Sequence, residues 1–122
     1  MTQKSELGKW GEDRACEYLV DKGFRILDRN YKRPWGELDI VAMAPDRTLV
    51  FVEVKTMGYS FGGLEPEHHM TAEKMRRFKR VASLYAGRHQ DLVADKKGWR
   101  LDLLALTEIG ENFDIRHYEN IA

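Results

Sequence analysis

Two runs of strand-forming residues, 37–43 and 48–55, are separated by a short turn that contains Pro45 and Asp46. Val, Ile and Phe dominate the second run and favour a strand, and Pro and Asp favour the turn between the runs. A turn this short predicts an antiparallel β-hairpin. This hairpin constrains the fold strongly, because it determines which side chains of the two strands share a face.

The polar residues of this hairpin follow apolar residues on the same face. Side chains alternate along a strand, so Glu53 and Lys55 share a face with Leu49 and Phe51. The first run is predicted to present Glu37, Asp39, Val41 and Met43 on one face and Leu38, Ile40 and Ala42 on the other. In a hairpin that turns at Asp46, Asp39 lies opposite Glu53. The side chains of Asp39, Glu53 and Lys55 are therefore predicted to converge.

Two adjacent carboxylates among apolar neighbours would repel each other, and a divalent cation would remove this repulsion. Oxygen ligands favour magnesium or manganese, and the backbone carbonyl of Val54 is a further candidate ligand beside Asp39 and Glu53. Lys55 could orient or deprotonate a metal-bound water, or neutralise charge on a phosphate. These groups suit a phosphodiester hydrolase. The spacing is equally compatible with a structural pair of Glu53 and Lys55 on a half-solvated sheet face.

Two helices are predicted from capping residues and periodic apolar positions. Ser5 caps a helix that runs to about Lys22, where Gly23 ends it. Thr71 caps a second helix that runs to about Arg88.

The remaining elements are strands and one long loop. Strands are predicted over 24–30, over 99–106 in the centre of the sheet, and over 113–118 at its edge. Residues 57–69 contain three glycines and a proline and are predicted to form a loop. This order predicts one domain over residues 1–122, with an α/β fold in which helices flank a mixed sheet.

The charged residues give no overall signal of nucleic-acid binding, because 20 basic and 20 acidic residues cancel. Basic residues do concentrate on the second predicted helix. Lys74 is expected inside the buried stripe of that helix, at the sheet edge or beside a phosphate. Arg76, Lys79 and Arg80 are expected to point away from the stripe, where they could follow a nucleic-acid backbone or simply face solvent.

Several classes of site and location are excluded or disfavoured. Cys16 is the single cysteine, so neither an intrachain disulfide nor a cysteine zinc cluster can form. No apolar run approaches the roughly 18 residues that span a bilayer, and the N-terminus has no signal-peptide core, so we expect a cytoplasmic protein. The adjacent His68 and His69 are not expected to bind a metal, and His89 and His117 are expected at the surface.

The acidic and E-x-K segments together carry a family resemblance. Gly36-Glu37-Leu38-Asp39-Ile40-Val41, followed by Val50-Phe51-Val52-Glu53-Val54-Lys55-Thr56, resembles the corresponding elements of the PD-(D/E)XK nuclease superfamily. The chain is most similar to the bacterial YraN family of candidate endonucleases, which are related to archaeal Holliday junction resolvases. The similarity covers about residues 8–106 and includes Gly8-Lys9-Trp10-Gly11-Glu12, Gly23-Phe24 to Asn30, Lys74 and Arg100-Leu101-Asp102.

The resemblance implies an αβββαβ, restriction-endonuclease-like core. In such a core Asp39 and Glu53 hold Mg²⁺ or Mn²⁺, Lys55 assists the attacking water, and Glu12 adds a carboxylate from the first helix. It further implies an endonuclease acting on structured or branched DNA, with Lys74 directed at a phosphate. Junction resolvases pair their subunits, so a homodimer is an open alternative. Met57 stands where the family often has a basic residue, so one phosphate contact is expected to be missing.

Two other function classes stay open. A noncatalytic nucleic-acid or protein-binding module that retains the nuclease fold would be compatible with zero net charge. A structural interaction protein would be compatible with a partner that covers the polar strand faces. The complete set of Asp39, Glu53 and Lys55 favours the enzyme, because a binding module has no physical need for a buried acidic cluster.

Overall fold

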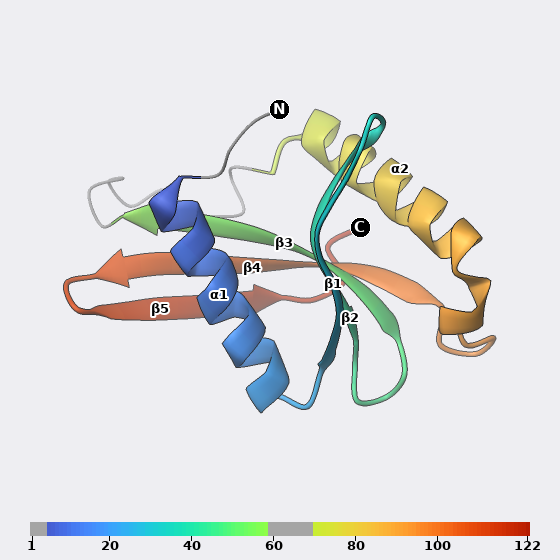
Figure 1. The fold of residues 1–122 in the computed structure, drawn as a ribbon, viewed down its shortest axis with the longest axis horizontal. Coiled ribbons are helices and arrows are strands. Elements are labelled where there is room, and N and C mark those ends of the chain that lie inside the picture. Colours follow the sequence, from blue (N-terminus) through green and yellow to red (C-terminus); the bar gives the residue numbers. More distant parts are fainter. Residues whose placement is uncertain (1–4, 59–69) are drawn as a thin grey trace.

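The computed structural model describes residues 5–58 and 70–122, and its elements follow the predicted order (Figure 1). They are α1 (Glu6–Asp21), β1 (Arg25–Arg33), β2 (Gly36–Met43), β3 (Leu49–Gly58), α2 (Ala72–Arg88), a short 3-10 helix η3 (Gln90–Leu92), β4 (Trp99–Ile109) and β5 (Asn112–Tyr118). No helix in these described ranges is long and apolar enough to cross a membrane.

The five strands form one mixed sheet in the order β1-β2-β3-β4-β5. Strands β3 and β4 are parallel, and the other neighbouring strands are antiparallel. Helix α2 lies in the connection between β3 and β4, as parallel neighbours require. The prediction of a mixed sheet flanked by helices is confirmed, and so are the predicted central position of β4 and edge position of β5.

One helix covers each face of the sheet, and both predicted N-caps are confirmed. The Ser5 Oγ accepts a hydrogen bond from the Gly8 N–H at the start of α1, and the Thr71 Oγ1 accepts one from the Lys74 N–H at the start of α2. The core under α1 contains Ala15, Leu19, Ile40, Val50, Val52, Leu104 and Leu106. The core under α2 contains Val41, Leu49, Phe51, Phe78, Val81, Tyr85 and Leu101.

Several strands run further than predicted, because backbone pairing continues after the apolar pattern ends. β3 pairs with β4 as far as Gly58, so Met57 is a buried strand residue and the prediction of a loop beginning there is wrong. β4 continues to Ile109, where it pairs with β5. The rest of the predicted loop, with His68 and His69, lies outside the described residues.

The β1–β2 hairpin bends toward α2, and its turn lies beside that helix (Figure 1). Gly36 has φ +145°, and a Cβ at this position would overlap the Val81 side chain. The predicted alternation fails in this part of β2, because Leu38 packs with Val41 in the core under α2 rather than with Ile40 on the other face. The close approach of the hairpin to α2 accounts for this difference.

Candidate active site

Asp39 lies where β2 and β3 stop pairing. The antiparallel register runs from Met43 opposite Leu49 to Ile40 opposite Val52, so Asp39 comes next, opposite Glu53. The Asp39 Oδ2 accepts a hydrogen bond of 2.9 Å from the Val54 backbone N–H. A side-chain carboxylate thus continues the strand pairing, and it reaches β3 between the two charged residues of the E-x-K segment.

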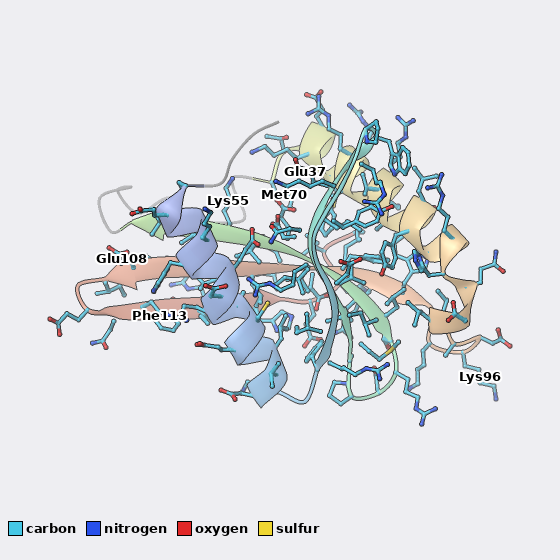
Figure 2. All side chains as sticks on the ribbon, in the orientation of Figure 1. Glu37, Lys55, Met70, Lys96, Glu108 and Phe113 are labelled. Atoms are coloured by element: carbon cyan, nitrogen blue, oxygen red, sulfur yellow. The ribbon has the colours of Figure 1, made fainter. Side chains whose placement is uncertain are left out.

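Lys55 interacts electrostatically with charged side chains from three elements. Partial burial lowers the pKa of its amine below the ordinary value, and the positive charge of Lys74 on α2 lowers this pKa further. The carboxylates of Glu53 and Asp39 act in the opposite direction. The structure therefore brings together Asp39, Glu53, Lys55 and Lys74, which we call the acid–lysine cluster. Figure 2 shows Lys55 on β3, on the side of the molecule where Glu37 and Met70 also lie.

A cleft of about 380 Å³ adjoins this cluster between the β1–β2 hairpin and the first half of α2. We call it the hairpin cleft. Its wall combines apolar and charged side chains, and it includes Glu53 from the acid–lysine cluster. The lining residues are Trp35, Gly36, Glu37, Glu53, Met70, Lys74, Arg77, Phe78 and Val81. Sequence patterns did not identify Trp35 or Arg77, although an aromatic residue in a hairpin turn was a visible signal.

The basic residues of α2 are all at the surface. Arg76, Lys79 and Arg80 are exposed, as predicted. The expectation that Lys74 lies inside the buried stripe is wrong, because Lys74 is exposed and the buried positions of the helix begin at Phe78. Lys74 sits in the first turn of α2, where it lines the hairpin cleft instead.

Glu12 is buried within α1, with 4% of its surface exposed. Its neighbour Gly11 packs so closely on β3 that a Cβ there would overlap the Thr56 side chain. Residues 5–58 and 70–122 contain no group of three or more His, Cys, Asp or Glu side chains placed to hold one metal ion. The role that the resemblance gives to Glu12 therefore stays a prediction.

The chemistry of Asp39 and Glu53 fits a hard divalent cation. Magnesium is commonly bound through one or two carboxylates, while water and substrate phosphate oxygens supply the other ligands. Two carboxylates on adjacent strands, one of them oriented by a backbone N–H, meet this requirement. The Val54 N–H is engaged by Asp39, and the Val54 carbonyl stays a candidate ligand.

A second polar cluster lies on the α1 side of the sheet, around the fully buried Asp102. The His117 Nε2 lies 2.8 Å from the Asp102 Oδ2, and the His117 Nδ1 lies 3.1 Å from the Tyr18 hydroxyl. Arg100 pairs with both Asp102 oxygens from two residues away on the same strand. The expectation that His117 lies at the surface is wrong, because the buried carboxylate draws its ring inward.

His89 is also less exposed than expected. Its ring stacks on Tyr85 with 4.1 Å between the centroids, and its Nδ1 lies 2.9 Å from the Tyr85 carbonyl oxygen. This histidine therefore completes the C-terminal end of α2 rather than standing free in solvent.

Comparison with known proteins places the chain in a family. Residues 11–106 match the model described as "Uncharacterised protein family UPF0102". A UPF0102 protein of Syntrophotalea carbinolica is 41% identical over 117 residues, which cover 95% of this chain and 90% of the relative. One from Campylobacter concisus is 36% identical over 115 residues, covering 94% and 92% of the two chains. One from Mycobacterium tuberculosis is 49% identical over 82 residues, covering 66% and 62%.

The family match covers both segments of the acid–lysine cluster that come from the β2–β3 hairpin, and it also covers Lys74 on α2. The similarity to the first two relatives extends over nearly the whole of each chain. The chain therefore belongs to the UPF0102 family.

Proposed function

We propose that the protein is a metal-dependent endonuclease that hydrolyses phosphodiester bonds in DNA. The observation that carries this proposal is the hydrogen bond from the Val54 N–H to the Asp39 carboxylate, which holds Asp39 beside Glu53 and Lys55. The resemblance of these segments to PD-(D/E)XK nucleases adds support. In this proposal the E-x-K residues form a reaction centre rather than a surface ion pair.

The residues of the acid–lysine cluster would bind the metal, act on the attacking water and contact a phosphate. Asp39 and Glu53 would hold Mg²⁺ or Mn²⁺, which when bound supplies a Lewis acid and lowers the pKa of water. Lys55 would orient the attacking water or stabilise negative charge at the phosphate, and its lowered pKa makes proton exchange easier than at an ordinary lysine. Lys74 would contact a phosphate oxygen at the edge of the hairpin cleft.

Helix α2 would bring the DNA backbone to this centre. Its exposed Arg76, Lys79 and Arg80 can replace counterions along a phosphate chain. The family resemblance further supports structured or branched DNA as the substrate and a homodimer as the acting form. The branched DNA substrate and the homodimer are both part of the proposal.

A cleavage assay tests the proposal. Purified protein is incubated with labelled junction, flap, single-stranded and duplex DNA in magnesium, manganese or EDTA. We expect metal-dependent cleavage that Lys55→Ala, Asp39→Asn and Glu53→Gln each lower by roughly 100-fold or more, because each removes a metal ligand or charge stabilisation. Glu111→Gln, an exposed acid in the β4–β5 turn, serves as the matched control and retains activity. Cleavage that persists in EDTA, or in all three variants, would contradict the proposal.

A noncatalytic DNA-binding module is the second candidate, because the exposed basic side chains of α2 need no metal to bind DNA. This alternative predicts salt-sensitive binding to the same substrates and no product in either metal. The same DNA panel therefore distinguishes the two functions.

A further inference from the structure

The hairpin cleft lies next to a proposed metal ligand and has a definite size. Glu53 belongs to the acid–lysine cluster and also lines the cleft. A group bound in the cleft would therefore lie next to the phosphate that would be cut. Its volume of about 380 Å³ lies near the lower end of the range for small-molecule sites. The cleft therefore has room for a single nucleotide unit.

The wall of the cleft suits a nucleobase. Trp35, Met70, Phe78 and Val81 provide apolar and aromatic surface, while Lys74 supplies a positive charge for the attached phosphate. Nucleic-acid enzymes that act on unstacked nucleotides combine these features: apolar or aromatic contacts to the base, and polar contacts to its edge and backbone.

The wall packs against α2 on the hairpin side. The Arg88 guanidinium lies over the Trp35 ring, 4.5 Å from its centroid, and so fixes the indole from the α2 side. The adjacent Gly36 packs directly against Val81. A preformed wall of this kind reduces the loss of side-chain freedom on binding.

Glu37 gives the cleft a chemical preference. It lies at the start of β2, is exposed and lines the cleft; Figure 2 shows it on the side of the molecule where Met70 also lies. A carboxylate only accepts hydrogen bonds, so it favours the exocyclic amino groups of cytosine, adenine and guanine. Thymine has no amino group, and its single N3–H donor lies between two carbonyl oxygens that repel a carboxylate, so thymine would be disfavoured.

We propose that the hairpin cleft binds one unpaired nucleotide beside the cleaved phosphate, and that Glu37 selects an amino-bearing base there. This inference rests on the proposed nuclease function and deepens it. It narrows the substrate class to DNA with an unpaired nucleotide at the cleavage position, such as a bulge, a flap base or a branch point.

Binding can be tested separately from cleavage. The Lys55→Ala protein in magnesium is titrated into fluorescein-labelled duplexes that are fully paired or carry one bulged C, A or T. We expect the bulged C and A duplexes to bind about tenfold more tightly than the bulged T or paired duplexes. Adding Glu37→Gln should reduce the ratio of C-bulge affinity to T-bulge affinity (the C-to-T ratio) to within about threefold, because an amide both donates and accepts hydrogen bonds. Adding Glu111→Gln instead, as the matched control, should leave the ratio unchanged.

Two Trp35 variants test the apolar wall. Trp35→Phe keeps an aromatic ring and should retain most of the preference for bulged DNA. Trp35→Ala should bind bulged DNA about tenfold more weakly. Thermal melts of both proteins check that the hairpin still folds. The inference would be overturned if the Lys55→Ala protein bound bulged and paired DNA equally, or if Glu37→Gln left the C-to-T ratio unchanged.

The two proposals fail in different ways. If the wild-type protein cleaves paired and bulged duplexes at the same rate, the nuclease function stands and the unpaired-nucleotide site is wrong. If it cleaves no DNA while the bulge preference holds, the nuclease function is wrong and the cleft remains a nucleotide-binding site.

Discussion

Asp102 on β4 is a fully buried carboxylate. Its Oδ1 accepts hydrogen bonds from the Arg100 Nε and the Asn120 N–H, each at 3.0 Å. Its Oδ2 accepts hydrogen bonds from the Arg100 Nη2 at 3.3 Å and, with the ring tautomer that carries the proton there, from the His117 Nε2 at 2.8 Å. The carboxylate thus ties β4 to β5 and the C-terminal segment, and His117 extends this network to Tyr18 on α1.

We expect Asp102→Asn to lower the free energy of unfolding by about 3 kcal/mol, because removing one partner of a buried pair leaves the other charge uncompensated. Urea denaturation at pH 7 measures this change. Asp114→Asn is the control, since Asp114 pairs with Arg116 on the surface and exposed pairs contribute about 1 kcal/mol at most. Equal effects of the two substitutions would contradict a structural role for the buried cluster.

The same residue predicts a pH dependence. Burial alone would raise the pKa of Asp102, but hydrogen bonds from His117, the Asn120 N–H and Arg100 outweigh burial and lower this pKa below the ordinary value of 3.8. A lowered acid pKa stabilises the fold above 3.8, and the contribution is lost as pH falls through the folded-state pKa. Urea midpoints measured from about pH 6 to about pH 2 should therefore fall more steeply for the wild type than for Asp102→Asn. Parallel curves would show that Asp102 does not contribute.

Among the candidate residues, the positions that sequence could predict are those that local strand geometry determines. Asp39, Glu53 and Lys55 followed from alternation and from the register of one short hairpin. The positions of Lys74 and His117 depend on how α2 and β5 pack against other elements. Side-chain periodicity carries no information about such packing, so the first was expected to be buried and the second exposed.

At the scale of elements, α1 docks on β3 through a glycine. We expect Gly11→Ala to destabilise the protein by about 1–3 kcal/mol, because the new methyl group would overlap the Thr56 side chain. Gly87→Ala is the matched control within α2, where no atom lies within 4 Å of the added Cβ. That change should stabilise the helix by roughly 0.5–1 kcal/mol. Thermal melts compare the two variants, and destabilisation by both would indicate a general intolerance of helix substitutions.

Helix α2 is predicted to be the DNA-contacting element. Reversing charge in Arg76→Glu/Arg80→Glu should weaken DNA binding and reduce the slope of log affinity against log salt by about 0.9 for each phosphate that the helix no longer neutralises. Anisotropy titrations from low to high salt measure the slope. Lys96→Glu/Lys97→Glu, which changes two exposed residues in the loop before β4, is the control of equal charge. If both double variants change the slope equally, α2 is not the contact surface.

Element types were predictable to a greater extent than their ends. Capping residues marked the starts of both helices correctly, because a cap is a local hydrogen bond. The strands ended later than predicted, since pairing with a neighbouring strand extends β3 through Gly58 and β4 through Ile109. The bend of β2 toward α2 was not predictable, because it depends on the contact of Gly36 with Val81.

For the molecule as a whole, metal binding should raise thermal stability. A cation at about 100 times its dissociation constant adds about 2.7 kcal/mol to the free energy of unfolding, if only the folded state binds it. We therefore expect magnesium to raise the melting temperature of the wild type, and to raise that of Asp39→Asn much less. Glu111→Gln, with its distant surface carboxylate, should respond as the wild type does. An equal magnesium shift in all three proteins would mean that Asp39 is not a metal ligand.

Hydrogen-bonded neighbours in the sheet are also neighbours along the chain, and this arrangement has a consequence for folding during synthesis. Asp39 and Val54 are 15 residues apart, so a short loop closure brings the two proposed ligand strands together. The parallel β3–β4 pairing joins residues such as Leu49 and Trp99, about 50 positions apart, and cannot form until β4 has been made. We therefore expect the two strands that carry Asp39 and Glu53 to pair on the ribosome first, while the parallel pairing of β3 with β4 completes the sheet later.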